Sequence, residues 1–222
     1  LISAILLSGK PGVIVTDSVT SDGLAEFIKN HGGVHRRFKR GYKNVIDESK
    51  RLNAEGIYSP LAIETSGHAA LRENYFLDDG AYLVTRILIS LAKLSNEGKD
   101  ISELIKDLPE PAEAAEVRLT FAEGADFKTL GNGAIEDIKT RAPAMDGLSL
   151  APDNFEGVRI VFGKDAGDGW ALVRMSLHEP IMPINFESNK PGGCRQIAKA
   201  LLSLLGKYDF LNTENLEKYL AK

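Results

Sequence analysis

The sequence has few of the features that mark secreted, membrane and nucleic-acid-binding proteins. It has one cysteine in 222 residues, so no intrachain disulfide can form. It has no uninterrupted apolar run of transmembrane length. Charge of neither sign dominates, because 27 basic residues are balanced by 31 acidic ones, and this balance gives no general attraction to nucleic acid or to anionic membranes. We therefore expect a cytoplasmic protein that binds neither nucleic acid nor membrane.

The sequence does contain enough apolar material for a substantial core. Hydrophobic residues make up 43% of the chain and charged residues 26%, as in ordinary globular proteins. A length of 222 residues fits one large domain or two ordinary ones. One basic cluster, at residues 35–40, surrounds Phe38. Because no further aromatic residues that could stack on bases are interleaved there, it predicts a solvated strand edge or a wall facing an anionic substrate.

Strand and helix signals alternate in the first half of the chain. Short apolar or β-branched runs predict strands at 13–15, 34–38 and 57–63. Helical spacing of apolar residues predicts helices from 21 to 32, from 44 to 56 and from 78 to 94. Alternation of this kind favours an α/β domain.

A break in the pattern separates the second half. Pro109 and Pro111 stop any helix, and their small and acidic neighbours offer little to a core. We place a boundary here and expect domains at 1–108 and 109–222. Beyond it, strands are predicted at 117–121, 158–162, 171–175 and 181–186, and helices at 134–139, 195–205 and 212–220. Grouped strands followed by helices indicate an α+β domain.

The segment Glu64-Thr65-Ser66-Gly67-His68 follows the predicted strand at 57–63, a location that favours ligand loops in α/β sheets. A carboxylate can accept two hydroxyls, a serine can donate or accept a third, and glycine lets the backbone approach a ligand. Histidine titrates near neutral pH, so His68 is a possible acid or base. This set suits a polyhydroxylated ligand. The alternative is that Glu64 and Ser66 only cap a turn.

A second motif, Arg-Met-Ser-Leu-His-Glu-Pro at 174–180, follows the apolar run at 171–175. Arg174 can contact two phosphate oxygens at once, and Ser176 and His178 can add donors. The alternative is an edge-strand arginine that pairs with Glu179. A site for hydroxyls and a site for an anion together suggest a sugar phosphate.

These motifs resemble those of the α-D-phosphohexomutases, the phosphoglucomutase/phosphomannomutase type. Glu-x-Ser-Gly-His is similar to the family's sugar-binding loop, and Arg-x-Ser-x-x-Glu-Pro to its phosphate-binding loop. Three further segments are similar to family segments in the same order: Gly41-Tyr42-Lys43, Asp78-Asp79-Gly80, and residues 154–159 with Gly169-Trp170. The resemblance runs along nearly the whole chain.

The resemblance implies the third and fourth of four domains. Residues 1–108 would be domain 3, a mixed α/β sandwich with a four-stranded sheet. Residues 109–222 would be domain 4, a smaller α+β domain with helices packed on an antiparallel sheet. The implied sugar-binding residues are Glu64, Ser66, Tyr42 and Lys43, and His68 is a possible acid or base. The implied phosphate-binding residues are Arg174, Ser176, His178 and Asn185.

The family's phosphoserine loop and its Asp-rich magnesium loop are not found in this sequence. The resemblance therefore implies a C-terminal fragment, inactive alone, whose partners are hexose phosphate and the missing N-terminal domains. The whole enzyme would interconvert hexose 1-phosphate and hexose 6-phosphate through a phosphoserine and a hexose bisphosphate. It would use Mg²⁺ whose ligands lie outside this chain, and we assign no metal ligand here. The alternatives are a non-catalytic sugar-phosphate-binding module and a structural α/β pair with decayed motifs.

The chain departs from the family pattern at several positions. Ile63 stands where a glycine usually precedes the glutamate, and His178 where threonine is common. Asn185 aligns with a second arginine of some relatives, so the phosphate site would carry less fixed positive charge. Thr65 is not the glutamine expected of a phosphoglucosamine mutase, which favours glucose or mannose phosphates.

Other reactive or ligating residue types receive structural interpretations. Cys194 follows Gly192-Gly193 at a predicted helix start, and we interpret it as an ordinary semi-buried cysteine. A glycine break separates His31 from His35, so no metal site is predicted from them. Asp78 and Asp79 are interpreted as cap and turn residues.

Overall fold

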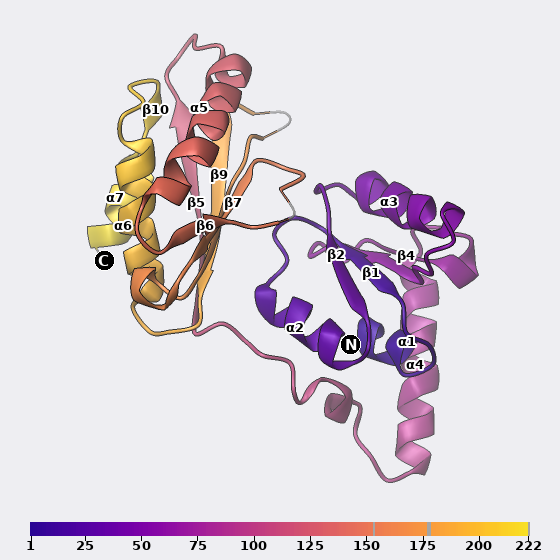
Figure 1. Cartoon of the computed structure of the whole chain (residues 1–222). Helices are drawn as coiled ribbons and strands as arrows, with labels where there is room; N and C mark the ends of the chain where they lie inside the picture. Colours follow the sequence, from indigo (N-terminus) through magenta and orange to yellow (C-terminus); the bar gives the residue numbers. More distant parts are fainter. Residues whose placement is uncertain (153, 177–178, 222) are drawn as a thin grey trace. The chain divides into compact units, whose positions relative to one another are not determined.

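The computed structural model describes residues 1–152, 154–176 and 179–221. The chain divides into two compact units of nearly equal length, Leu1–Glu110 and Pro111–Lys222. Each unit has its own sheet and its own helices (Figure 1). The division lies beside the two prolines at which the sequence analysis placed the boundary.

Unit 1 is built on a four-stranded sheet in the order β2-β1-β3-β4. Its strands are β1 (Val13–Thr16), β2 (Val34–Arg37), β3 (Leu61–Ile63) and β4 (Ala69–Leu71). Its helices are α1 (Ile2–Leu7), α2 (Asp22–Asn30), α3 (Tyr42–Ala54) and α4 (Gly80–Asn96), with 3₁₀ turns η1 (Arg72–Asn74) and η2 (Ile101–Ile105). Strand β1 runs parallel to β2 and β3, whereas β4 runs antiparallel to β3, so the sheet is mixed as expected.

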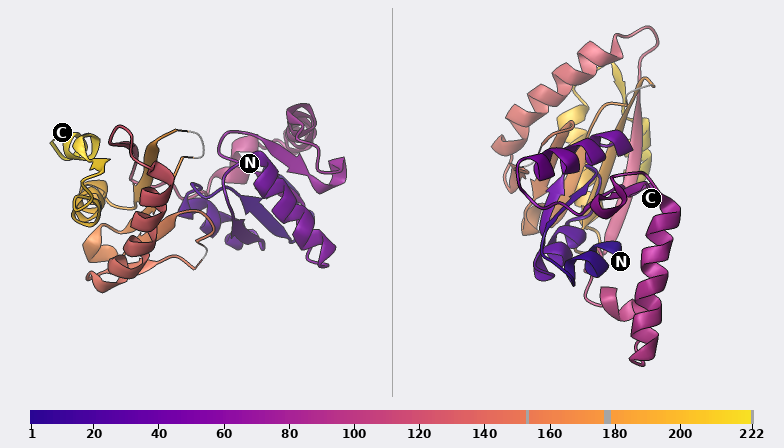
Figure 2. Two further views of the ribbon diagram at one scale, coloured as in Figure 1. Left: turned by 90° about the horizontal axis from the view of Figure 1, so that it is seen from above. Right: turned by 90° about the vertical axis from the view of Figure 1, so that its right-hand side faces the viewer.

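Helices cover both faces of this sheet (Figures 1 and 2). Helices α1, α2 and α4 pack on one face, in a core that contains Ile14, and α3 packs on the other face against Val15. Both residues have no exposed surface. Successive strand residues point to opposite faces, so a continuous apolar run such as 13–15 is the pattern of a strand covered on both sides.

Strand β3 is shorter than predicted, and two elements of unit 1 were not predicted at all. Residues 57–60 are outside β3, and Pro60, which has no backbone N–H to give to a ladder, directly precedes it. Strand β4 is only three residues long and begins Ala-Ala, so its sequence carries no strand signal. Helix α1 covers residues for which no element was predicted.

Unit 2 is built on a six-stranded antiparallel sheet in the order β10-β5-β9-β8-β7-β6. Its strands are β5 (Glu113–Phe121), β6 (Leu148–Leu150), β7 (Val158–Phe162), β8 (Gly169–Val173), β9 (Ile181–Ser188) and β10 (Leu211–Asn212). Its helices are α5 (Phe127–Arg141), α6 (Gly193–Leu205) and α7 (Glu214–Ala221), with 3₁₀ turns η3 (Ala142–Ala144) and η4 (Lys164–Ala166).

One face of this sheet carries the core of unit 2. Alternate residues of each strand, such as Leu119 on β5 and Ile184 on β9, pack with Leu201 of α6. Figure 1 shows α5, α6 and α7 on the same side of the sheet. The expected fold class, an α/β unit followed by an antiparallel sheet packed by helices, is confirmed. Among the helices of the described ranges, none is long and apolar enough to cross a membrane.

Several elements of unit 2 differ from those predicted. Strands β6 and β10 were not predicted, and β8 runs from Gly169 to Val173 rather than from 171 to 175. Strand β5 begins at Glu113, inside the segment expected to be a linker. Helix α5 begins at Phe127, seven residues before its predicted start, with Asp126 as its cap. Gly131 lies within this helix and weakened its sequence signal, but a Cβ there would lie 2.2 Å from Met175 Sδ. The end of the Met175 side chain therefore occupies the space beside the residue that lowered the helix propensity.

We expect Leu201→Ala to destabilise unit 2 by about 2–5 kcal/mol, because Leu201 is fully buried and its truncation leaves a cavity. Leu202→Ala, on the adjacent half-buried residue, should cost less than half as much. Urea unfolding followed by the fluorescence of Trp170, the single tryptophan, measures both variants. Equal losses would contradict this assignment of the core.

Candidate functional site

The motif at 64–68 forms the tip of the β3–β4 hairpin. Glu64 N donates to His68 O at 2.9 Å, and Gly67 N donates to Glu64 O at 3.0 Å, which closes the loop at its base. Gly67 has a φ of +92°, a conformation that L side chains rarely adopt. All five residues of the motif therefore lie in one compact loop directly after β3.

The Glu64 carboxylate lies at the N-terminus of α3 and is only 8% exposed. Its Oε1 accepts a hydrogen bond from Gly41 N at 2.6 Å. Gly41 is the N-cap of α3, with a φ of +114°, and has no side chain to satisfy the first helical N–H groups. The Glu64 carboxylate does not reach those groups but accepts from the N–H of Gly41 itself, and in this position it interacts favourably with the helix dipole. This contact joins the 64–68 loop to Tyr42 and Lys43.

The His68 ring is held between an acidic and an aromatic side chain. Its Nδ1 lies 2.7 Å from Asp78 Oδ2, and its centroid lies 5.4 Å from that of Tyr42. When Nδ1 carries the proton, it donates to the Asp78 carboxylate, and Nε2 is then the acceptor atom of a half-exposed ring. Asp78, predicted as a cap or turn residue, therefore orients His68. Asp79 does cap α4, because its carboxylate accepts from Tyr82 N at 3.0 Å.

Two predicted sugar-binding groups point to no partner in the protein. Ser66 and Lys43 are exposed, and within the described part of the chain neither forms a hydrogen bond or an ion pair. A hydroxyl and an ammonium group are therefore available to a ligand beside Glu64.

One residue at this loop was missed by the sequence analysis. Asp17 directly follows β1, and its carboxylate accepts from Thr65 N at 3.2 Å and from Thr65 Oγ1 at 2.7 Å. The only sequence signal is an acidic residue shortly after the predicted strand at 13–15.

The motif at 174–180 connects β8 to β9. Arg174 N donates to Pro183 O and Ser176 N to Ile181 O, so the hairpin ladder continues past β8. Ser176 Oγ accepts from Glu179 N at 3.2 Å. The arginine and serine thus stand two residues apart at the end of a strand with neighbours on both sides. His178, the third predicted phosphate ligand, lies outside the described residues.

Arg174 is paired with a different carboxylate from the one considered in the sequence. Its Nη1 lies 3.8 Å from Glu156 Oε1, and both side chains are largely buried. Strand β8 is an interior strand of the sheet, so Arg174 does not stand on an edge. The ion pair is longer than the 2.7–2.9 Å typical of a charge-assisted hydrogen bond. Its partner is supplied by the segment before β7.

Asn185 lies on β9 opposite Glu116 of β5. Its Nδ2 donates to Glu116 Oε2 at 2.9 Å, and its buried Oδ1 has no hydrogen-bond partner within the described ranges. Burial acts to raise the pKa of Glu116, but hydrogen bonds from Arg118 and Asn185 and the charges of Arg118 and Arg174 outweigh it and lower the pKa. Asn185 therefore faces a carboxylate in the structure, and its predicted contact with phosphate stays a prediction.

Gly157 holds the backbone of the second motif in place. It has a φ of +60°, and a Cβ there would lie 2.1 Å from Val173 O and 2.9 Å from Arg174 Cα. The chain can therefore turn between Glu156 and β7 only if this position lacks a side chain.

Gly157→Ala should displace Arg174 and destabilise unit 2 by about 1–3 kcal/mol, since it adds both a clash and a strained backbone. Gly133→Ala is the matched control, because Gly133 lies in α5 with open space around its Cβ position. Thermal unfolding of both variants measures the difference. A Gly157→Ala variant as stable as the control would contradict the close packing described here.

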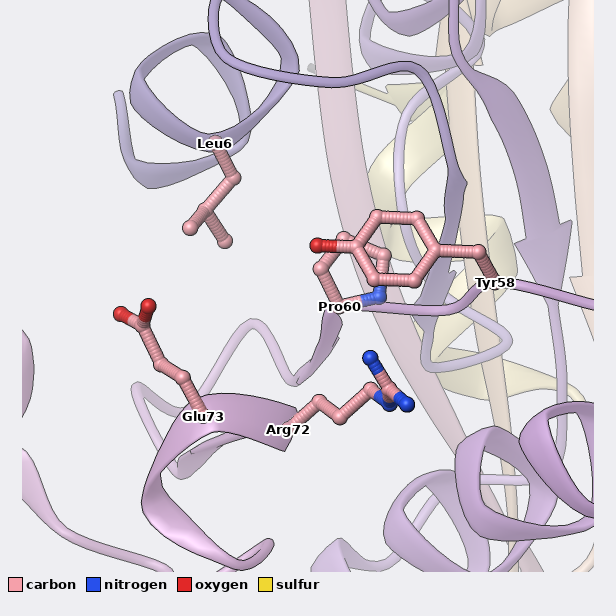
Figure 3. A pocket seen from close by; sticks show the side chains of 5 residues that line it. All are labelled: Leu6, Tyr58, Pro60, Arg72 and Glu73. Atoms are coloured by element: carbon pink, nitrogen blue, oxygen red, sulfur yellow. The ribbon is translucent and has the colours of Figure 1, made fainter.

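A separate hollow of about 210 Å³ lies at the opposite end of the β3–β4 hairpin. Figure 3 shows Tyr58 and Pro60 on the segment before β3, and Arg72 and Glu73 on η1 after β4. Arg72 N donates to Pro60 O there. Strands β3 and β4, each three residues long, separate this hydrogen bond from the 64–68 loop. None of the predicted sugar-binding residues lines this hollow.

Cys194 is fully buried, not semi-buried as expected. The N-terminus of α6 is occupied by the Glu113 carboxylate, which accepts from Gly192 N at 2.6 Å and from Cys194 N at 2.9 Å. Burial, together with the charges of Glu113 and Glu187, raises the pKa of the Cys194 thiol to about 11.

A thiol with a raised pKa has little thiolate at pH 8, so Cys194 should resist alkylation in the folded protein. We expect iodoacetamide at pH 8 to leave native Cys194 unmodified over a period in which the urea-unfolded chain reacts fully. Intact-mass measurement reads the modification. Rapid alkylation of a chain that keeps its native circular dichroism would contradict this prediction.

The structure thus places the predicted residues in two groups. Glu64, Ser66, Tyr42, Lys43 and His68 belong to unit 1, where contacts join Glu64 to the start of α3 and His68 to Tyr42. Arg174, Ser176 and Asn185 belong to unit 2. The described residues contain no group of three or more His, Cys, Asp or Glu side chains that could hold a metal ion.

Comparison with known proteins identifies relatives of both units. The chain is 28% identical over 186 residues to a phosphomannomutase/phosphoglucomutase of Pseudomonas aeruginosa. The aligned region covers 83% of this chain and 36% of that protein. It is 28% identical over 202 residues to a phosphoglucomutase/phosphomannomutase of Thermococcus kodakarensis, and this alignment covers 91% of the chain and 40% of the relative. The crystal structure of a phosphoglucomutase/phosphomannomutase family protein from Burkholderia thailandensis matches with a TM-score of 0.71 and 25% identity. The match covers 93% of this chain and 40% of that one.

The chain therefore spans less than half the length of these relatives. Residues 1–112 match the family model for phosphoglucomutase/phosphomannomutase, alpha/beta/alpha domain III. This match covers half of the chain, and the relatives cover most of the remainder. The chain belongs to the phosphoglucomutase/phosphomannomutase family.

Proposed function

We propose that this chain supplies the sugar-binding and phosphate-binding loops of an enzyme that interconverts hexose 1-phosphate and hexose 6-phosphate. The observation that carries the proposal is the arrangement of Glu64. Its carboxylate is fixed through one oxygen to Gly41 N, while Ser66 and Lys43 beside it are exposed and form no hydrogen bond or ion pair within the described ranges. Polar groups that are held in place but not all used by the protein suit a polyhydroxylated ligand.

In this proposal unit 1 binds the sugar. Glu64 Oε2 and Ser66 Oγ would bind ring hydroxyls, and the Tyr42 ring would pack against the sugar. Lys43 would contact an anionic oxygen. His68 would hold or release a proton at Nε2, with Asp78 keeping the ring in one orientation.

Unit 2 would bind the phosphate that is not transferred. A phosphate would bind the Arg174 guanidinium in competition with the Glu156 carboxylate. Ser176 would add a hydroxyl donor, and His178 and Asn185 would add weaker ones. Holding one phosphate while the other end of the sugar reacts is a positioning task.

The rest of the reaction would belong to domains outside this chain, since the relatives are more than twice as long. We place the phosphoserine that exchanges its phosphoryl group with the substrate there. Magnesium would neutralise charge on the transferred group, and a hexose bisphosphate would be the intermediate. We propose no magnesium ligand among the residues of this chain. The protein would work in the cytoplasm.

Calorimetric titration with glucose 1-phosphate and mannose 1-phosphate tests the proposal. We expect the wild-type chain to bind, and Glu64→Ala or Arg174→Ala to weaken binding at least tenfold, about 1.4 kcal/mol. Glu97→Ala, which removes an exposed carboxylate paired with Lys99, is the control and should bind normally. The chain alone should show no mutase turnover.

Two outcomes would contradict the proposal. If a wild-type chain that melts cooperatively binds neither sugar phosphate, the two loops do not form a working half-site. If it binds with an affinity that neither variant changes, the ligand occupies some other part of the chain, as a separate binding module would.

A further inference from the structure

Asp17 is a fully buried carboxylate to which the proposed function assigns no role. It follows β1 directly, and β1 is the parallel neighbour of β3. Burial of a charged carboxylate is unfavourable unless its oxygens accept hydrogen bonds. The donors that face Asp17 therefore indicate what this residue holds in place.

Three donors converge on the Asp17 carboxylate. Oδ2 accepts from Thr65 N at 3.2 Å and from Thr65 Oγ1 at 2.7 Å. Oδ1 accepts from Thr20 Oγ1 at 2.8 Å. One oxygen therefore binds both the backbone and the side chain of Thr65, and the other oxygen is fixed by the loop that leads into α2.

We infer that Asp17 is a positioning residue for the sugar-binding loop: its carboxylate clamps Thr65 and thereby sets the positions of Glu64 and Ser66 on either side. The inference rests on the proposed function of that loop. It adds an anchor from a strand outside the hairpin, 48 residues earlier in the chain.

The register of the sheet explains why the anchor comes from β1. Thr16 pairs with Ile63, so the residues that follow them, Asp17 and Glu64, leave the sheet side by side. Thr65 is the next residue of the loop. The two hydrogen bonds within the loop fix only its base, through Glu64, Gly67 and His68. The contact with Asp17 adds a constraint on the loop from the neighbouring strand.

Such a constraint has a chemical consequence for ligand binding. Groups that bind a sugar must be held to within about 0.5 Å of the productive geometry by surrounding contacts. Glu64 accepts a hydrogen bond from Gly41 N, and the next residue, Thr65, donates one to Asp17. With both contacts in place, the loop does not have to order itself when a ligand binds, which saves conformational entropy.

The contact with Asp17 also bears on what Thr65 indicates about the substrate. The sequence analysis favoured glucose or mannose phosphates because Thr65 is not a glutamine. In the structure, the Thr65 hydroxyl donates to Asp17. Threonine at this position is therefore explained by the anchor, and it no longer distinguishes one hexose phosphate from another.

Asp17→Asn and Thr65→Val test the clamp with little change in volume. An amide in place of the carboxylate has one acceptor oxygen for the three donors, and valine removes the hydroxyl donor but keeps the Thr65 N–H. Ser59→Ala is the control. Ser59 is buried in the same unit, where its hydroxyl donates to Val13 O and contacts Ser49 Oγ, away from the 64–68 loop.

Two readouts are measured on the full chain: amide hydrogen exchange at residues 64, 65 and 67, and calorimetric titration with glucose 1-phosphate. We expect Asp17→Asn to speed exchange in the loop at least tenfold and to weaken binding at least tenfold. Thr65→Val should give smaller changes of the same kind, and the double variant should lose little more than Asp17→Asn. Ser59→Ala should lower the melting temperature without either effect.

The outcomes separate this inference from the proposed function. Loop exchange that is unchanged in Asp17→Asn would overturn the clamp. Faster exchange with unchanged binding would overturn the positioning role. If the wild-type chain binds no sugar phosphate, the proposed function fails, and the exchange experiment alone decides whether Asp17 anchors the loop.

Discussion

A carboxylate at a helix N-terminus that has no cap of its own is the constraint on which both units depend. Helices α3 and α6 each begin after a glycine, Gly41 or Gly192, which offers no side chain to the first N–H groups. In each case a glutamate from elsewhere in the same unit accepts from the N–H of that glycine: Glu64 from Gly41 and Glu113 from Gly192. Glu113 also accepts from Cys194 N inside α6. Backbone hydrogen bonds from Gly192 and Cys194 lower the pKa of Glu113, so it remains an anion there. Both contacts join a helix to the sheet that it covers.

The sequence predicted most regular elements because their local pattern and their tertiary surroundings agree. The apolar run at 13–15 lies in a strand covered on both faces, and Ser21 caps α2 at the predicted start of the helix. The failures occur where the two disagree. The Ala-Ala-Leu of β4 becomes a strand only through its pairing with β3. Gly131 weakens the local signal of α5, but the helix packs there against the end of the Met175 side chain.

The candidate site was predicted as far as its motifs are continuous in the sequence. The loops at 64–68 and 174–180 were located from residue types alone, and both lie at strand ends in the structure. The partners of those loops could not be found in this way, because tertiary structure brings them together. Asp17 is 48 residues from Thr65. Arg174 contacts Glu156 and not Glu179 of its own motif, because β7, which follows Glu156, pairs with β8, which precedes Arg174.

The charge around Arg174 explains why an ordered sugar loop would matter in this protein. Its largely buried guanidinium is balanced by Glu156, and its charge also acts on the nearby Glu116. A phosphate would have to compete with these carboxylates, and Asn185 adds a neutral donor where a second arginine would add charge. In the proposed function, binding energy from the anion would be reduced accordingly. A larger share would then come from the hydroxyls of the sugar. Neutral hydrogen bonds are individually weak, so they contribute most when their protein partners are already in place before the ligand binds.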